Sequence, residues 1–182
     1  IAIGSGALFQ NTTGGKNIAI GLSAAVNNTS GSNNIALGDQ AFTSNTTGSE
    51  NIVIGNNSLQ SNTTGTSNTA VGFNTLGRNT TGSLNTASGA NALNANTTGS
   101  NNIGIGYRVM NNMNGGTKNT VVGNDAGYSF TTGSYNACLG SDAGGQITTG
   151  SKNTIIGGYN GNQGGLDIRT NSNHIVLSDG DG

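Results

Sequence analysis

Short apolar runs recur along this chain every 17 residues, separated by longer stretches of small and polar residues. The clearest runs are Ile1 to Ile3, Ile18 to Ile20, Ile35 to Leu37, Ile52 to Ile54, Thr69 to Val71, Ile103 to Ile105, Thr120 to Val122 and Thr154 to Ile156. β-Branched residues dominate them, and the repeated units contain no stretch of helix-forming length free of glycine. We therefore expect each run to be a β-strand. A fixed short period indicates one structural unit stacked on copies of itself.

Three columns of nearly invariant residues accompany the runs. A glycine follows each run from Gly4 to Gly157, a second glycine column starts at Gly14, and an asparagine precedes each run from Asn17 to Asn153. We interpret the glycines as corners, where the backbone must turn. The asparagines are expected to hydrogen-bond to their equivalents one coil away. Each unit then has room for two short strands and two turns, and forms one coil of a parallel β-solenoid.

Both faces of each run are apolar. The third position is apolar in all but one unit, and the second position holds only Ala, Val, Gly, Cys or Ile. Because side chains alternate along a strand, these two columns point in opposite directions, and a strand that is apolar on both sides is buried on both sides. We expect the third position to pack inside the coil and the second position, including Ala87, to meet other copies of the chain. A second apolar cluster in each unit, typified by Ala41 and Phe42, is expected to close the core.

The 17-residue register breaks near residue 160. Residues 161–173 are irregular and rich in Gly and Asn, and a strand resumes at Ile175, 21 residues after Thr154. We divide the chain accordingly into a repeat region of about ten coils over residues 1–160 and a transition into a following strand or domain over residues 161–182.

The composition fits a thin, stacked fold. Hydrophobic residues make up 31% of the chain, aromatics 4% and charged residues 7%, with 33 Gly and no Pro or Trp. Few large side chains are available to fill a broad core. The net charge of -1 and the regular apolar positions argue against disorder. Six Lys and Arg give no basis for nucleic-acid binding, and no apolar run is long enough to span a bilayer. Because the chain opens inside a repeat, we expect a segment of a longer protein.

Residues with catalytic or metal-binding chemistry are few. Catalysis needs a nucleophile with a base, paired acids or clustered metal ligands. His174 is the only histidine and is expected in a polar loop, while Cys138 lies in an apolar column and is expected to be a buried structural thiol. We therefore predict that the chain is not an enzyme, with no catalytic, cofactor or metal site.

Two pairs of carboxylates leave cation binding open. Asp125 and Asp142 share a column on adjacent coils, so they repel each other unless Ca²⁺ or neighbouring donors compensate. Solvated surface acids are the alternative. Asp179 and Asp181 resemble part of a Ca²⁺ loop, but the downstream Glu of such a loop is not seen within residues 1–182, and a turn needs no metal.

Two polar motifs are generated by the repeat itself. N-x-S/T sequons begin at Asn11, Asn28, Asn45, Asn62, Asn79 and Asn96. Glycosylation there requires a eukaryotic secretory route. Paired threonines recur at Thr46 and Thr47, Thr63 and Thr64, Thr80 and Thr81, and Thr97 and Thr98. Flat threonine arrays on β-solenoids look like ice-binding surfaces, although the glycine after each pair favours a corner.

The units NTTGSENIVIG, NTTGSLNTASG and TTGSKNTIIGGYNG resemble the repeats of trimeric β-roll proteins, over essentially the whole chain. The heads of YadA-like trimeric autotransporter adhesins carry a similar N-x-[apolar]-A-[Ile/Leu/Val]-G motif in a shorter repeat. Bacteriophage tail-fibre proteins are more similar, because their NTTGS repeats precede a segment like residues 172–182. In that group an endosialidase-type intramolecular chaperone often follows.

The resemblance implies an all-β homotrimer of left-handed parallel β-rolls, so that the partners are two further copies of the chain. It implies a structural fibre or head segment of a virion tail fibre or surface appendage, which holds or forms a host-attachment surface and contacts a host receptor or glycan. The expected location is the virion or the bacterial cell surface. The alternatives are a bacterial adhesin head that binds host matrix or glycans, and an ice-binding β-solenoid.

Overall fold

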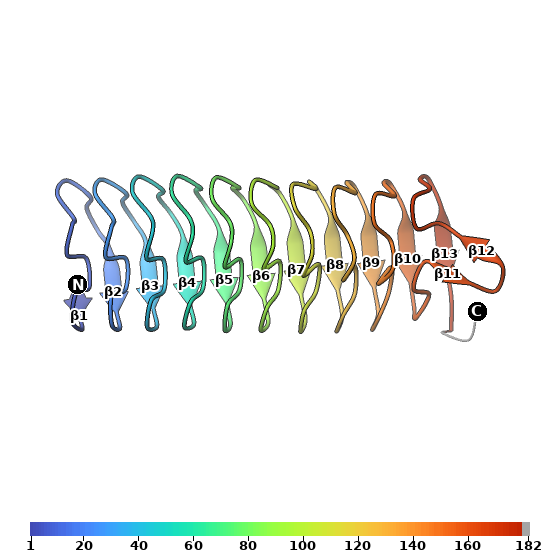
Figure 1. Cartoon of the computed structure of the whole chain (residues 1–182), viewed down its shortest axis with the longest axis horizontal. Coiled ribbons are helices and arrows are strands. Elements are labelled where there is room, and N and C mark those ends of the chain that lie inside the picture. The colour runs from blue at the N-terminus through green and yellow to red at the C-terminus, as the bar shows by residue number, and fades with distance from the viewer. Residues whose placement is uncertain (180–182) are drawn as a thin grey trace.

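The computed structural model describes residues 1–179, which form strands, turns and bends with no helix among them. Successive coils follow one another along a rod, and each coil contributes one short strand to the same sheet (Figure 1). The strands are β1 (Ala2–Ile3), β2 (Ile18–Ile20), β3 (Ile35–Leu37), β4 (Ile52–Ile54), β5 (Thr69–Val71), β6 (Thr86–Ser88), β7 (Ile103–Ile105), β8 (Thr120–Val122), β9 (Ala137–Leu139), β10 (Thr154–Ile156) and β13 (Ile175–Leu177). They form an 11-stranded sheet in the order β1 to β10 and then β13.

Each strand pairs in parallel with its equivalent one coil away. Val53 of β4, for example, lies opposite Ala36 of β3 and Ala70 of β5. The predicted all-β parallel solenoid of about ten 17-residue coils is therefore confirmed. The second strand expected in each coil is absent from residues 1–179, because the TTG segments are bends. The N–H groups of Thr46 and Thr47 both donate to the carbonyl oxygen of Thr63, so the alternating bonds of a strand ladder do not form.

The orientation predicted for the strand faces is wrong. The second-position column, which includes Val53 and Ala87, lies inside the coil and is fully buried. The third-position column points outward, and Ile54 and Ile105 are exposed to 39% and 44%. Ala87 therefore faces the interior of its own coil and does not meet another chain.

The two walls of the coil explain this orientation, because their side chains compensate in size. The strand faces a turn wall, formed by the sixth to tenth positions of each unit. A Cβ atom at Gly104 of β7 would lie 2.4 Å from Leu93 of the turn wall, whereas one at Gly144 of the turn wall would lie 3.3 Å from Ile155 of β10. Small strand residues thus face large turn residues and the reverse, which fills a thin core at native density. The predicted apolar cluster, with Ala41 and Phe42 fully buried, does close this core.

The asparagine column forms the predicted ladder inside the coil. The Nδ2 of Asn68 donates to the Oδ1 of Asn51 at 3.1 Å and to the carbonyl oxygen of Gly82 at 2.9 Å. Its backbone N–H donates to the same Oδ1 at 3.0 Å, and Asn85 makes equivalent bonds to Asn68. Each amide is buried and satisfied by its neighbours, so the ladder fixes the register of successive coils.

A second asparagine ladder, which the sequence analysis did not foresee, precedes the TTG bends. The Nδ2 of Asn62 donates to the Oδ1 of Asn45 at 3.0 Å and to the carbonyl oxygen of Gly65 at 3.1 Å. Further along the chain the same column holds Met113, Phe130 and Ile147, all fully buried. The coil interior therefore changes from hydrogen-bonded amides to apolar packing toward the C-terminus.

The glycine after each strand is required by both its backbone angle and its neighbours. Gly89 has a φ of 130°, and a Cβ there would lie 2.3 Å from the carbonyl oxygen of Gly106 in the next coil. Any side chain at this corner would push adjacent coils apart.

The break in the repeat is a hairpin that projects from the last described coil. β11 (Asn162–Gln163) and β12 (Leu166–Asp167) pair antiparallel beside the end of the rod (Figure 1). The main sheet resumes as predicted, because β13 pairs with β10 at an offset of 21 residues, with Thr154 opposite Ile175.

Candidate functional site

The outward side of the sheet is an apolar stripe that follows the whole rod. It consists of Ile3, Ile18, Ile20, Ile35, Leu37, Ile52, Ile54, Thr69, Val71, Thr86, Ser88, Ile103, Ile105, Thr120, Val122, Ala137, Leu139, Thr154, Ile156, Ile175 and Leu177. None of these residues is charged, and Leu139 and Leu177 are exposed to 53% and 74%. The stripe is therefore uncharged along its length and open to solvent in the single chain, although β6 contributes only Thr86 and Ser88 to it.

The area of the apolar stripe is well above the apolar area of single scattered surface residues. Eleven strands spaced about 4.8 Å apart give a length of about 50 Å, and three residues give a width of about 10 Å. The resulting area, about 500 Å², is comparable with the largest apolar patches on soluble monomers, and such patches commonly mark interaction sites.

Charged residues flank the apolar stripe at its two corners. Lys16, Glu50, Lys118 and Lys152 lie just before strands, whereas Asp39 lies just after one. An apolar centre between polar edges is the usual anatomy of a protein–protein interface.

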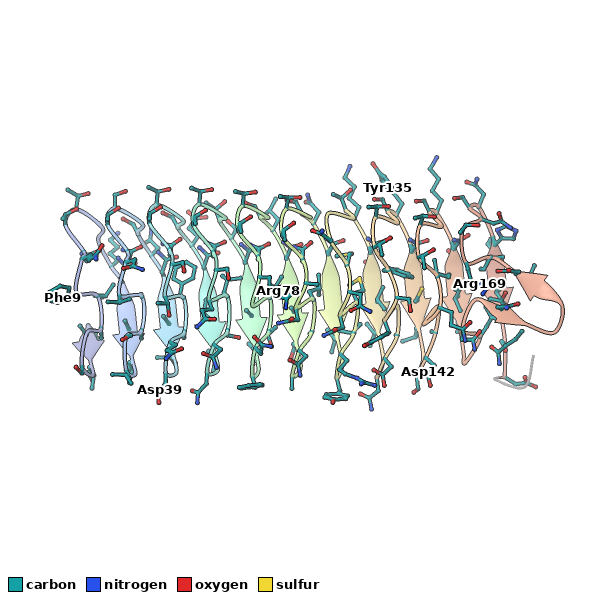
Figure 2. The ribbon with its side chains drawn as sticks, viewed as in Figure 1. Phe9, Asp39, Arg78, Tyr135, Asp142 and Arg169 are labelled. Atoms are coloured by element: carbon teal, nitrogen blue, oxygen red, sulfur yellow. The ribbon has the colours of Figure 1, made fainter. Side chains whose placement is uncertain are left out.

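A second feature, which we call the polar groove, lies on the turn wall beside the hairpin. It has a volume of about 460 Å³ and is lined by residues that include Arg108, Asp125, Tyr128, Asp142 and Gln146. Tyr135 is a corner residue that precedes β9 and flanks the apolar stripe. Figure 2 shows Asp142 at one edge of the rod and Tyr135 at the opposite edge.

The best-defined contact in the polar groove is an ion pair between adjacent coils. The Nε and Nη2 of Arg108 donate to the two carboxylate oxygens of Asp125 at 2.7 and 2.9 Å. The guanidinium carbon of Arg108 lies 5.1 Å from the ring centroids of both Tyr107 and Tyr128. Hydrogen bonding to Asp125 raises the pKa of Arg108. Of the two ways in which the charge of Asp125 could be compensated, by a cation or by neighbouring donors, the structure therefore supports neighbouring donors.

The cation candidates that lie within residues 1–179 do not form a recognisable metal centre. Asp142 is exposed, and residues 1–179 contain no group of three or more His, Cys, Asp or Glu side chains able to hold a metal ion. Asp179 lines a different pocket, and Asp181 lies outside the described residues.

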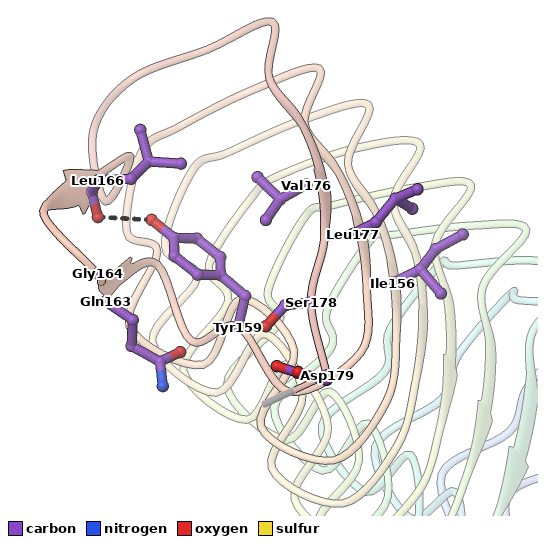
Figure 3. Close-up of a pocket in the computed structure, with 9 residues that line it drawn as sticks. All are labelled: Ile156, Tyr159, Gln163, Gly164, Leu166, Val176, Leu177, Ser178 and Asp179. Carbon is purple, nitrogen blue, oxygen red and sulfur yellow. Dashed lines mark hydrogen bonds between the residues drawn. The ribbon is translucent and has the colours of Figure 1, made fainter. Parts of the chain in front are cut away.

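That different pocket lies under the hairpin, at the end of the described rod (Figure 3). It has a volume of about 650 Å³, and its lining includes Ile156, Tyr159, Val176 and Leu177. The Tyr159 hydroxyl donates to the carbonyl oxygen of Leu166 at 2.7 Å, which ties the hairpin to the coil. Burial, followed by the charge of Asp167, raises the pKa of Tyr159.

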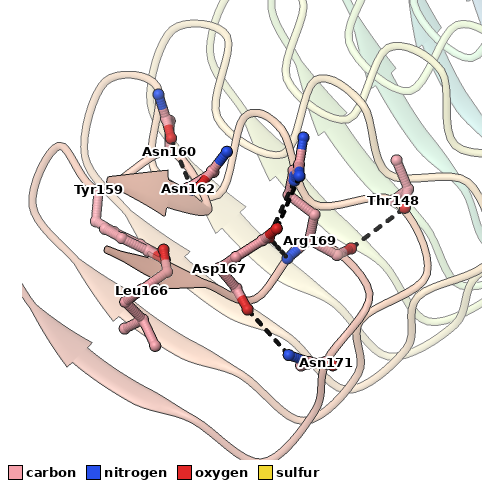
Figure 4. Close-up of polar contacts among 8 residues, drawn as sticks. All are labelled: Thr148, Tyr159, Asn160, Asn162, Leu166, Asp167, Arg169 and Asn171. Carbon is pink, nitrogen blue, oxygen red and sulfur yellow. Dashed lines mark hydrogen bonds and ion pairs between the residues drawn. The ribbon is translucent and has the colours of Figure 1, made fainter. Parts of the chain in front are cut away.

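Polar contacts hold the base of the hairpin (Figure 4). The Nη2 of Arg169 lies 2.7 Å from a carboxylate oxygen of Asp167, and hydrogen bonds from Arg169 lower the pKa of Asp167. The carbonyl oxygen of Arg169 accepts a hydrogen bond from the hydroxyl of Thr148, and Asn171 Nδ2 donates to the carbonyl oxygen of Asp167. These contacts position the hairpin beside the polar groove.

His174 and Cys138 both have structural surroundings. His174 occupies the ladder position that asparagine holds in earlier coils, and its backbone N–H donates to the Oδ1 of Asn153 at 3.0 Å. It is half-buried at the ladder end, in the loop segment that leads into β13, where a polar loop residue was expected. Cys138 is buried as predicted, and burial raises the pKa of its thiol to about 12.

The sequons and threonine columns are largely used by the fold itself. Asn45 and Asn62 are fully buried in the second ladder, where the folded coil has no room for an attached glycan. The hydroxyl of Thr46 donates to the carbonyl oxygen of Thr63, and the hydroxyl of Ser49 accepts the backbone N–H of Ser32. The first threonine of each pair is therefore engaged by the fold, whereas the second, such as Thr47 or Thr64, is exposed on a bend.

No family model matches this chain, and searches of curated proteins and of solved structures find no match either. Among residues 1–179, no helix is long and apolar enough to cross a membrane. The functional interpretation consequently rests on the two surfaces described above.

Proposed function

We propose that this chain is a non-enzymatic structural segment of an extracellular fibre, in which three copies assemble through the apolar stripe as left-handed β-rolls. The fibre is the shaft or head of a virion tail fibre or bacterial surface appendage, and holds or forms a host-attachment surface. The observation that carries the proposal is the continuity of the stripe from β1 to β13, without one charged side chain.

The free energy available from covering the stripe is large enough for stable assembly. Sixteen of the 21 stripe residues are apolar, so about 380 Å² of apolar surface per copy contributes about 10 kcal/mol at roughly 25 cal/mol per Å². Association costs about 4 to 15 kcal/mol in lost motional freedom, so three copies that each bury a stripe retain a surplus.

The narrowness of the stripe favours three copies over two. Two sheets packed face to face lie about 10 Å apart, which equals the width of the stripe, so both long edges of such a dimer would stay open to water. Three narrow faces arranged around one axis cover one another and leave no long edge open.

The charged corners are compatible with copies that run parallel and in register. In that arrangement a corner before a strand meets the corner after the equivalent strand of the neighbouring copy. Glu50 then meets Asn56 beside β4, and Lys118 meets Asn124 beside β8. Asp39 meets Asn33 in the same way beside β3. No two like charges therefore face each other in this arrangement. Repulsion between like charges would oppose assembly.

Sedimentation velocity of the purified chain tests the proposal. We expect the parent chain to be a trimer. The variant that combines Ile54→Lys and Ile105→Lys should be a monomer with an unchanged circular dichroism spectrum, because both outward side chains would place charges in the shared core. The control combines Thr64→Lys and Thr98→Lys on exposed bends, and should remain trimeric. A monomeric parent chain, or a trimer that survives both stripe substitutions, would overturn the proposal.

A bacterial adhesin head is the second candidate, because the polar groove is a concave surface of the kind that recognises ligands. In that role the same trimer would bind host matrix or glycans directly. Binding of purified trimer to immobilised matrix proteins, compared with binding to phage-susceptible bacterial cells, separates the two roles. Preferential capture by the matrix proteins would favour the adhesin.

A further inference from the structure

The sixth position of each unit changes in chemistry where the polar groove begins. It holds Asn57, Asn74 and Asn91 in successive central coils, and then Arg108, Asp125 and Asp142 in the next three. Stacking alone does not require this change, because asparagine serves the earlier coils at the same left-handed backbone angle. Only 7% of the chain is charged, so three consecutive charged residues in one column are unusual for this chain.

The hairpin insertion supplies the far side of the groove. The backbone N–H of Gln146 donates to the carbonyl oxygen of Asn160 at 2.7 Å, which holds the turn wall against the start of the insertion. The open groove has a volume of about 460 Å³, which lies within the range of about 300 to 1,000 Å³ typical of small-molecule sites. The groove therefore depends on both the repeat and its interruption.

The polar side chains in the groove have hydrogen-bonding capacity left for a ligand. Among residues 1–179, Asp142, Ser129 and Gln146 make no side-chain hydrogen bond within the protein. A carboxylate accepts hydrogen bonds, an amide both donates and accepts them, and a hydroxyl does either. Next to them, the paired Arg108 and Asp125 are already held in place, so little ordering is needed on binding.

We propose that the polar groove binds a saccharide. Adjacent hydroxyl groups of a sugar ring offer the donors and acceptors that Asp142 and Gln146 lack, and Tyr128 lines the same groove. A phosphate or other anion is disfavoured because Asp125 neutralises Arg108, and Asp142 adds a negative charge. An apolar peptide is disfavoured by the polar lining.

This proposal names a ligand class for the proposed attachment function. Its biological purpose rests on that function, whereas the binding itself does not. The groove is lined by the turn wall and the hairpin and includes no residue of the apolar stripe, so assembly through the stripe would leave three grooves open. Three equivalent sites would raise the avidity for a surface covered with glycans without any new contact.

A printed array of bacterial surface polysaccharides and mammalian oligosaccharides, probed with the tagged parent chain, tests the proposal. For a glycan that binds, calorimetry should show at least a tenfold loss of affinity when Asp142→Asn is combined with Gln146→Ala. The control combines Glu50→Gln with Gln10→Ala, which removes one carboxylate and one amide far from the groove. Glu50 and Asp142 share a left-handed backbone, and Gln10 occupies the same repeat position as Gln146, so the two pairs are matched. The control should bind like the parent chain.

The outcomes separate this inference from the proposed assembly. A trimer that binds no arrayed glycan, or that loses no affinity in the groove variant, overturns the saccharide site and leaves the fibre standing. A monomer that binds a glycan through Asp142 and Gln146 overturns the trimer and leaves the site standing. Equal losses in the groove variant and its control would also overturn the site, because the effect would then be unrelated to the groove.

Discussion

Replacing Asn68 by aspartate is the sharpest test of the inner ladder, because the two side chains differ by a single group. Aspartate at this position still accepts the backbone N–H and Nδ2 of Asn85, which lie 3.0 and 3.2 Å from the present Oδ1. It loses both bonds that Asn68 Nδ2 donates, to Asn51 Oδ1 and to the carbonyl oxygen of Gly82. Asn68→Asp therefore turns a donor into an acceptor directly opposite two other acceptors.

The expected cost follows from that geometry. Two lost hydrogen bonds cost about 2 kcal/mol together at the usual net value of about 1 kcal/mol each. An ionised carboxylate at this fully buried position adds several kcal/mol more, partly relieved if the group takes up a proton. We expect Asn68→Asp to lower the free energy of unfolding by about 4 kcal/mol at pH 7.

The same reasoning fixes the sign of the pH dependence. Burial and the two acceptors that face the introduced carboxyl, Asn51 Oδ1 and the carbonyl oxygen of Gly82, outweigh the two donors of Asn85 and raise its pKa above the ordinary value of about 4. The folded state therefore binds a proton at a higher pH than the unfolded state does. The penalty is therefore largest at pH 7 and shrinks as the pH falls through the raised pKa. At pH 4 the protonated group can restore one donated bond.

Guanidinium denaturation followed by circular dichroism, at pH 7 and pH 4, measures both effects. The control is Asn101→Asp, which introduces the same charge at an exposed corner whose φ of 60° both residues tolerate. It should change the free energy of unfolding by less than about 0.5 kcal/mol. If the two variants lose equal stability, or if the cost at position 68 does not fall with pH, the ladder does not hold the coils together as argued.

Three further variants test the corner, the core and the buried thiol. Gly89→Ala should destabilise the chain by more than 2 kcal/mol in the same denaturation assay, because its Cβ would lie 2.3 Å from a carbonyl oxygen of the next coil. Gly15→Ala has open space around its Cβ and should be near neutral. Similar costs for the two variants would refute the corner argument. Leu59→Ala should cost about 3 kcal/mol and Leu84→Ala less than 1 kcal/mol, since only Leu59 is buried and both have left-handed backbone angles of 48° and 60°. Cys138, with its pKa raised to about 12, should resist a thiol-reactive dye at pH 8 until guanidinium unfolds the chain, and rapid labelling of native protein would contradict its burial.

The stacking of the coils was predictable from the sequence because equivalent residues recur at an exact spacing of 17. The strand positions, the ladder from Asn17 to Asn153 and the resumption at Ile175 all follow from counting residues. The direction of each strand face was not predictable from one column alone, because both faces are apolar. The deciding signal is a relation between columns, in which Gly104 accompanies Leu93 and Ile155 accompanies Gly144. Size compensation of this kind identifies residues that share a core.

The second ladder and the polar groove were missed for different physical reasons. Asn62 precedes Thr-Thr-Gly, which is also a common surface turn, so its burial depends on the path of the whole coil. The groove joins Asp142 and Gln146 to an insertion that departs from the repeat, and periodicity carries no information about where such an insertion folds.

The asparagine ladders also determine how the length of such a rod can change. Each amide hydrogen-bonds to its equivalent one coil away, as Asn51 does to Asn34 and Asn68 does to Asn51, so an inserted or deleted single residue would misalign every later pair. Removal of one complete unit, such as residues 52–68, would instead rejoin equivalent positions. The rod is thus a ruler with a fixed graduation of about 4.8 Å, and genetic duplication or loss of whole units changes its reach without changing its cross-section.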